Sequence, residues 1–174
     1  MRYTAIAVLA LLVAQSAACG LAGSEVIMVE PSEPVPGDHP VEISFEFLVL
    51  SDAASTEQIR YIWIWFPDVL VPHESALWYE EIEPGRPAVA MRLQQLDIAE
   101  WRISDYFVEP MYVGESLRIG VTAIMYPQPP STWAELTWML QGESGTTIHG
   151  YLSIYTTPVE CESWGRVKAL YRDN

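Results

Sequence analysis

Tyr61-Ile-Trp-Ile-Trp-Phe66 is the stretch that decides the fold of this chain. Side chains alternate across a β-strand, so Tyr61, Trp63 and Trp65 are expected on one face and the apolar residues between them on the other. Both faces are apolar and rich in aromatic and β-branched residues, which predicts a central strand covered on both sides. Six residues suit a strand and are too few for a membrane-spanning helix.

Alternating segments elsewhere in the chain predict further strands. In each segment every second side chain is apolar and is expected to point inward, and turns rich in proline or glycine separate the segments. This pattern predicts an all-β, mostly antiparallel sandwich of about seven to nine strands, with a small closed barrel as the alternative. The segments are Val41–Phe47, Ala88–Leu93, Ser116–Tyr126, Trp133–Leu140 and Thr146–Thr156.

One segment favours a helix instead of a strand. Leu96, Ala99 and Ile103 recur near helical spacing. Two acidic residues at its beginning suit the first turn of a helix, where negative charge is favoured. We therefore predict a helical insert over 96–107.

The first segments after the N-terminal region carry a resemblance to a known fold. Val26–Val29 is short and apolar, Pro31–Asp38 is rich in proline and ends in Pro-Gly-Asp, and Val41–Phe47 alternates cleanly. This order resembles the opening strands of bacterial immunoglobulin-like domains. The resemblance implies an immunoglobulin-like antiparallel sandwich, which we place at residues 25–158.

The composition limits both the size of the fold and its partners. The chain has 174 residues, enough for one domain with a proper core and short for two. Its formal net charge is −14, from 9 Lys+Arg against 23 Asp+Glu. Nucleic-acid phosphates would be repelled by such a chain, so nucleic acid is excluded as a partner.

The N-terminal segment is typical of a signal peptide. Arg2 supplies a positive charge, Ala5–Ala14 is an apolar run of signal-peptide length, and small residues follow it up to Ala18. The run is too short for a comfortable transmembrane helix. Residues 1–18 are therefore expected to form a signal-peptide helix that directs export.

The residues after this leader resemble a lipidation site. Ser16-Ala17-Ala18-Cys19 resembles the lipobox of bacterial lipoproteins, in which the cysteine thiol is diacylated and becomes the mature N-terminus. The resemblance implies membrane anchoring through lipid on Cys19, with residues 19–24 as a flexible tether. The alternative is ordinary cleavage after Ala18 or Ala22 and a secreted or periplasmic soluble protein.

The state of the second cysteine, Cys161, depends on whether Cys19 is acylated. Cys19 and Cys161 are the two cysteines of the chain, so at most one internal disulfide is possible. If Cys19 is acylated, Cys161 is an unpaired thiol in the C-terminal tail, residues 159–174. Otherwise the two cysteines can pair and join the ends of the chain.

The search for catalytic and metal-binding motifs is mostly negative. The sequence has no GxSxG, no glycine-rich phosphate loop, no HExxH, no EF-hand spacing and no CxxC. We predict no enzyme, no cofactor and no metal, and rank a hydrolase or a Cys161–His nucleophile last. The acidic residues considered for calcium binding or for a glycosidase pair, and better explained as a solvated loop, are Asp68, Glu74, Glu80, Glu81 and Glu83.

Aromatic side chains are the feature that suggests a ligand. Exported β-sandwiches often bind sugars by stacking pyranose rings on Trp or Tyr. Core packing is the favoured alternative for each of these residues, since large aromatics are usually well buried. The candidates for contact with a glycan are Trp63, Trp65, Trp78, Tyr79 and Trp133.

A second candidate surface is the row His149, Tyr151 and Tyr155. These residues alternate with apolar ones in Thr146–Thr156, so they share the outward face of the expected strand. Tyrosine offers a large contact area with few torsions to freeze, and an unperturbed imidazole titrates near pH 6–7. β-propensity alone also explains such a row.

Together these features predict an exported protein of the cell envelope, lipid-anchored to a membrane, with a non-enzymatic interaction or structural β-sandwich. Its partner would be an unknown envelope protein or glycan. A carbohydrate-binding module that uses exposed Trp and Tyr is the alternative. Exposure of the face that carries Trp63 and Trp65 separates the two.

Overall fold

The computed structural model describes residues 20–33, 35–37, 39–80, 91–97, 100–129 and 133–157. The leader over 1–18, Cys19 and the tail over 159–174 lie outside these residues. Within them, the chain forms eleven strands and one short 3-10 helix, Glu74–Ala76. The strands are β1 (Glu25–Glu30), β2 (Val35–Pro36), β3 (Val41–Leu50), β4 (Ile59–Phe66), β5 (Leu70–Pro72), β6 (Trp78–Tyr79), β7 (Arg92–Asp97), β8 (Glu100–Met111), β9 (Ser116–Met125), β10 (Trp133–Gly142) and β11 (Thr147–Thr157).

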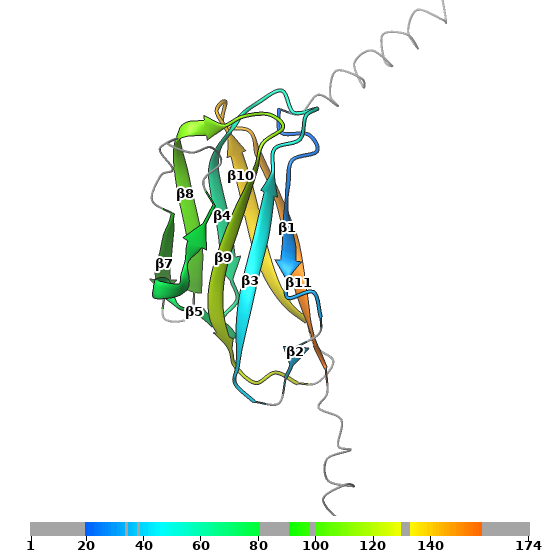
Figure 1. The fold of residues 1–174 in the computed structure, drawn as a ribbon, viewed down its shortest axis with the longest axis vertical. Helices are drawn as coiled ribbons and strands as arrows, with labels where there is room; N and C mark the ends of the chain where they lie inside the picture. Colours follow the sequence, from blue (N-terminus) through cyan, green and yellow to red (C-terminus); the bar gives the residue numbers. More distant parts are fainter. Residues whose placement is uncertain are drawn as a thin grey trace, which may run out of the picture.

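The strands form two sheets that pack face to face as a sandwich (Figure 1). One sheet has the order β1-β3-β9-β5, with β6 also paired to β9. The other has the order β2-β11-β10-β4-β8-β7. Every pairing between described strands is antiparallel except the short parallel pair of β2 with β11. The predicted all-β, mostly antiparallel sandwich is confirmed. The described strands outnumber the predicted seven to nine because β2, β5 and β6 are short segments of two or three residues.

The core between the sheets is built from the inward rows that alternation predicts. In β9, Leu117, Ile119, Val121, Ala123 and Met125 are all buried. Aromatic rings join the two sheets: Phe45 and Phe47 of β3 contact Phe66 of β4 edge to face, with ring centroids 5.7 and 6.3 Å apart.

Strand β4 lies in the middle of the six-stranded sheet, between β10 and β8, as predicted. Its inner row, Ile62, Ile64 and Phe66, is buried in the core. Its outer row is half-buried and lies on the solvent side of the sheet. The interpretation of Trp63 and Trp65 as core residues, covered by a second layer, is therefore wrong.

The predicted helical insert over 96–107 is also wrong, because this region is a β-hairpin of β7 and β8. Ile103 and Phe107 of β8 are buried and alternate with outward Tyr106 and half-buried Ser104. Leu96, which suggested the helical spacing, is 43% exposed. The register shows the alternation: Ile103 lies opposite Ile64 of the buried row, whereas Ser104 and Tyr106 lie opposite Trp63 and Tyr61 of the outer row. Pairing with β4 on one side and β7 on the other satisfies the backbone of β8.

The described chain begins in close contact with the domain. The carbonyl of Gly20 accepts hydrogen bonds from the hydroxyl of Ser55 (2.6 Å) and from the backbone N–H groups of the next two residues (2.9 and 2.8 Å). Leu21 is fully buried. The flexible tether expected over 19–24 is therefore packed against the sandwich from Gly20 onward.

Glu57 holds the same end of the sandwich together. Its carboxylate accepts hydrogen bonds from the hydroxyls of Ser144 (2.5 Å) and Thr146 (2.9 Å), in the hairpin between β10 and β11. These bonds, that of Ser144 foremost, hold the pKa of Glu57 below its usual value of about 4.5, although burial acts in the opposite direction. A Cβ atom at Gly20 or Gly142 would lie 2.1 Å from this carboxylate, so a larger residue at either position would push the Glu57 side chain out of its present place.

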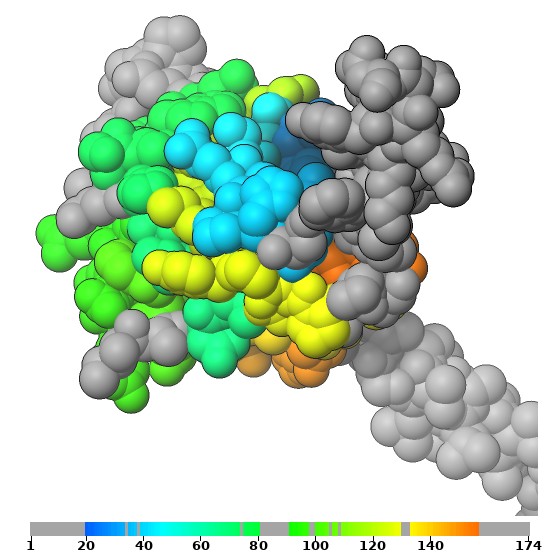
Figure 2. Space-filling model, turned by 90° about the horizontal axis from the view of Figure 1, so that it is seen from below, coloured from blue at the N-terminus to red at the C-terminus, as the bar shows by residue number. Residues whose placement is uncertain are grey.

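The opposite end of the sandwich is closed by the segment that follows β9. There the N–H of Gln128 donates to the carbonyl of Gly37 (2.8 Å), and the N–H of Tyr126 donates to the carbonyl of Val69 (2.8 Å). Figure 2 looks at this end, where that segment (yellow) runs beside the beginning of β3 (cyan). The described chain thus starts at one end of the sandwich and leaves β11 at the other (Figure 1).

Candidate functional site: the aromatic face

The outer face of the six-stranded sheet gathers aromatic side chains from four strands. Registers place Trp63 of β4 opposite Met139 of β10, which lies opposite His149 of β11. Directly opposite residues in an antiparallel pair share a face, so these rows can be followed across the sheet. We call this surface the aromatic face; its aromatic members are Tyr61, Trp63, Trp65, Tyr106, Trp133, Tyr151 and Tyr155.

The centre of the aromatic face is a continuous stack along β4. The rings of Tyr61 and Trp63 have centroids 5.2 Å apart and an interplanar angle of 8°, and those of Trp63 and Trp65 are 6.5 Å apart at 16°. Tyr106 of β8 packs against Tyr61 at 4.8 Å, and the guanidinium of Arg60 lies 5.7 Å from the Tyr106 ring centroid. The stack buries part of each ring although no core encloses it.

The β10–β11 side of the face is more exposed. Trp133 is 62% exposed and contacts Tyr155, with ring centroids 4.8 Å apart. Tyr151 is 66% exposed, and His149 is exposed two residues before it on the same face. The outward direction predicted for His149, Tyr151 and Tyr155 is therefore confirmed.

Trp78 and Tyr79 do not belong to this surface. They form β6, which pairs with β9 in the other sheet. The indole of Trp78 lies directly over Gly120, where a Cβ atom would come within 2.0 Å of the ring, and Tyr79 packs against the core. The structure thus brings together six of the eight predicted contact residues, Trp63, Trp65, Trp133, His149, Tyr151 and Tyr155, and separates these two from them.

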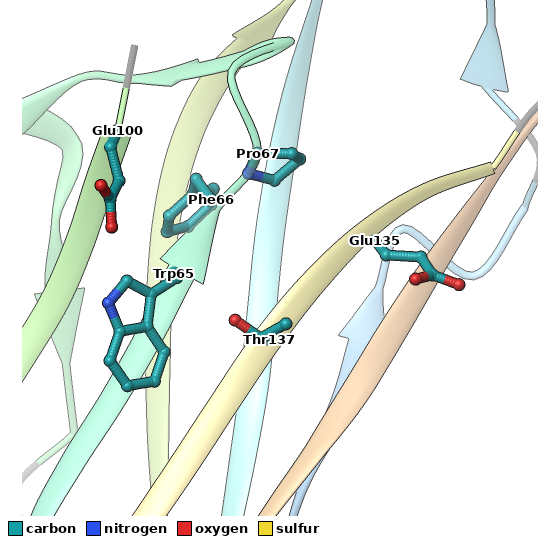
Figure 3. A pocket seen from close by; sticks show the side chains of 6 residues that line it. All are labelled: Trp65, Phe66, Pro67, Glu100, Glu135 and Thr137. Atoms are coloured by element: carbon teal, nitrogen blue, oxygen red, sulfur yellow. The ribbon is translucent and has the colours of Figure 1, made fainter. Parts of the chain in front are cut away.

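A shallow open groove of about 450 Å³, which we call the Trp65 groove, lies where the aromatic stack ends (Figure 3). The indole of Trp65 lines it, and the side chains at the end of β4 extend it. Glu100 of β8 flanks it on one side and Glu135 of β10 on the other. The six lining residues are Trp65, Phe66, Pro67, Glu100, Glu135 and Thr137.

The groove is lined by two acidic side chains and by no basic one. Glu100 and Glu135 are exposed, and neither forms a hydrogen bond or ion pair within the described part of the chain. Arg102 lies next to Trp65 in the register, but its guanidinium donates to Gln94 of β7 (3.0 Å). The groove therefore has an aromatic wall, two unpaired carboxylates and the hydroxyl of Thr137.

Possible metal ligands do not cluster in the part of the chain that the structure describes. No group of three or more His, Cys, Asp or Glu side chains there could hold a metal ion. Glu80 lies beside Arg118 at 4.0 Å, whereas Glu81, Glu83 and Cys161 lie outside the described residues. No helix among those residues has the length and hydrophobicity of a membrane span.

Sequence reasoning left several residues of the face out of the contact candidates. Tyr61 was expected on the same side of its strand as Trp63 and Trp65, so alternation alone could have added it to them. Tyr106, Glu100 and the partners on β10 become neighbours only through strand register, which one sequence does not contain.

The fold is that of an immunoglobulin-like β-sandwich, as comparison with solved structures shows. The major pilin subunit BcpA of Bacillus cereus matches 78% of this chain, with a TM-score of 0.54 and 9% identity. The N-terminal domain of the Streptococcus gordonii adhesin Sgo0707 matches 80%, with 0.52 and 9%. An uncharacterized immunoglobulin-like protein from Nocardia farcinica matches 77%, with 0.51 and 10%.

The extent of these matches differs between the three proteins. The match covers 40% of the pilin chain and 33% of the adhesin chain, but 97% of the Nocardia chain. No family model matches the sequence, and no curated protein resembles it in sequence. At such low identity the likeness establishes the fold alone.

Proposed function

We propose that this chain is a non-enzymatic interaction domain of the cell envelope, exported by its leader and anchored through lipid on Cys19, and that the aromatic face is its binding surface. The observation that carries the proposal is the gathering of six predicted contact residues on one sheet face that no described strand or helix covers. Aromatic side chains enriched at one place, with polar edges, are typical of protein-binding surfaces. The pilin and adhesin among the similarly folded proteins support a role at the cell surface.

The ends of the molecule suit this arrangement. Gly20, next to the expected lipidated cysteine, is held at the end where β4 begins, and the Trp65 groove lies where β4 ends. The eight residues of β4 span about 25 Å at roughly 3.3 Å each. A lipid anchor at Cys19 would therefore leave the groove on the far side from the membrane.

The anchor is tested by fractionation and lipid labelling in the native host. Cys19→Ala should move the protein from the membrane to the soluble fraction and abolish labelling by a fatty-acid analogue. Cys161→Ala is the matched control and should leave both unchanged. Membrane partition of Cys19→Ala equal to that of the unmodified protein would exclude the lipid anchor.

The binding surface is tested by capture of the native partner. Tyr151→Ala and Tyr155→Ala should weaken recovery of the crosslinked partner from envelopes while leaving thermal unfolding nearly unchanged, because Tyr151 is largely exposed. The control Tyr79→Phe lies on the other sheet and should bind normally. Normal capture by both alanine variants would remove this face as the binding surface.

A carbohydrate-binding module is the second candidate, because no described strand or helix covers the face of Trp63 and Trp65. However, an extended sugar platform needs several ring faces open side by side. Trp63 stacks against Tyr61 on one side and, with a larger offset, against Trp65 on the other, so both of its faces are partly occupied. The stack therefore favours a protein partner over a long glycan.

A further inference from the structure

The Trp65 groove differs from the rest of the β4 stack because part of the Trp65 indole lines an open groove. Trp65 contacts Trp63 on one side and lines the groove, whereas Trp63 does not. One indole is thus available there to a ligand, at the end of a stack that fixes its orientation. A single available ring suits one compact group better than a chain of sugars.

The carboxylates of the groove indicate the charge of that group. Glu100 and Glu135 line opposite sides of it and have no partner among the described residues. Figure 3 shows the Glu100 carboxylate extending toward the indole of Trp65 and Glu135 extending toward β11. Glu135 is exposed and lines the groove.

Among the described residues, the nearby basic side chain of Arg102 forms no ion pair with Glu100 or Glu135. Arg102 donates to Gln94 on the edge strand β7 and is not among the residues that line the groove. The whole chain adds a net charge of −14, which attracts cations toward every face. In addition to this diffuse attraction, the groove offers a cation a local site made of an aromatic wall and two unpaired carboxylates.

We propose that the groove between Glu100 and Glu135 takes an arginine or lysine side chain from a basic segment of the partner protein, with the cation against the indole of Trp65. The inference rests on the proposed function, whose surface it specifies. Cations bind aromatic faces through the ring quadrupole, and carboxylates strengthen the contact by charge-assisted hydrogen bonds. Arginine is favoured because its planar guanidinium stacks and also pairs with a carboxylate.

The test uses short peptides whose ends are acetylated and amidated. A peptide of alternating glycine and arginine is titrated against one with glutamine in place of arginine, and against cellohexaose, at about 0.15 M salt, where diffuse attraction is screened beyond about 8 Å. The readout is the NMR signal of the Trp65 indole N–H, assigned by its loss in Trp65→Phe. We expect the arginine peptide to shift this signal and the other two ligands to leave it in place.

Two charge variants separate the groove from the net charge of the protein. Glu100→Gln with Glu135→Gln should weaken binding of the arginine peptide about tenfold. Glu25→Gln with Glu42→Gln removes the same charge from exposed positions on the other sheet and should change it less than about twofold. All four residues are exposed and unpaired in the described chain, so neither variant should alter folding.

Several results would overturn the inference. Equal weakening by both charge variants would show diffuse attraction only, and no shift with the arginine peptide would exclude the site. A shift with cellohexaose that survives the Gln variants would assign the groove to a sugar. If the Glu100/Glu135 variant still captures the native partner while Tyr151→Ala does not, the proposed binding face stands and this inference fails.

Discussion

Trp63 is the residue that connects stability with the aromatic face. Its ring lies between those of Tyr61 and Trp65, so alanine at this position removes two ring contacts and part of the burial of both neighbours. We expect Trp63→Ala to lower the free energy of unfolding by about 1–3 kcal/mol, less than for a fully buried aromatic because the side chain is half-exposed. Urea unfolding followed by circular dichroism measures the loss.

Two neighbours serve as controls for this prediction. Ile64→Ala, in the buried row of the same strand, should cost about 2–5 kcal/mol. Trp133→Ala, which is 62% exposed, should cost less than about 1 kcal/mol. A loss for Trp63→Ala no larger than that for Trp133→Ala would show that the stack contributes nothing to folding.

The charge of Glu57 makes the stability of the fold depend on pH. Its folded-state pKa is lowered, chiefly by the hydroxyl of Ser144, so its stabilising contribution is present above the unfolded pKa of about 4.5 and is lost as the pH falls through the folded value. Glu57→Gln should therefore be less stable than the unmodified protein at pH 7, and the difference should shrink below pH ~4. Thermal unfolding at several pH values measures it. A difference that is constant with pH would contradict the role of the charge.

At the residue scale, alternation predicted which side chains point inward but not what covers the others. In β9 and β11 the inward and outward rows were correct. In β4 both rows are apolar, so the pattern could not tell a buried aromatic row from a stacked one on the surface. In the structure, the rings of the outer row are half-buried because aromatic rings at alternate positions of one strand can cover one another.

The hairpin of β10 and β11 shows how an element depends on one small residue. Gly150 lies opposite Trp138 on the inner side of the hairpin, and a Cβ atom at that position would be 2.6 Å from the indole. Trp138 is buried and its ring is rigid, so Gly150→Ala should force a shift and cost about 1–3 kcal/mol in unfolding free energy.

Ser153→Ala is the matched control on the same strand, because Ser153 is exposed on the outer side. It should change the unfolding free energy by less than about 0.5 kcal/mol. Equal stability of the two variants would mean that Trp138 can move away from Gly150 without loss.

Elements were predictable where one face is buried and much less so at the edge of the sheet. The hairpin of β7 and β8 was predicted as a helix because three apolar residues fell near helical spacing. β7 is an edge strand with Leu96 exposed, so its local pattern is weak, and its pairing with β8 is a tertiary contact. The short strands β2, β5 and β6 likewise depend on their neighbours rather than on their own sequence.

For the whole molecule, the fold class followed from the alternating segments and the proline- and glycine-rich turns between them, whereas the site could be assembled only from the strand topology. The order β2-β11-β10-β4-β8-β7 brings the row Tyr151 and Tyr155 onto the same face as Trp63, although some ninety residues separate them in the sequence. The same topology puts Trp78 on the other sheet. A single sequence contains the period of each strand but not the order of strands in a sheet.

Photo-crosslinking in living cells tests the central claim, that the aromatic face is the binding surface, most directly. A photoreactive phenylalanine analogue at position 151 lies on that face, and the same analogue at position 42 lies on the other sheet. We expect a crosslinked adduct from position 151 that is lost when Trp65→Ala is added, and no adduct from position 42. An adduct from position 42 alone, or equal adducts from both positions, would contradict the account.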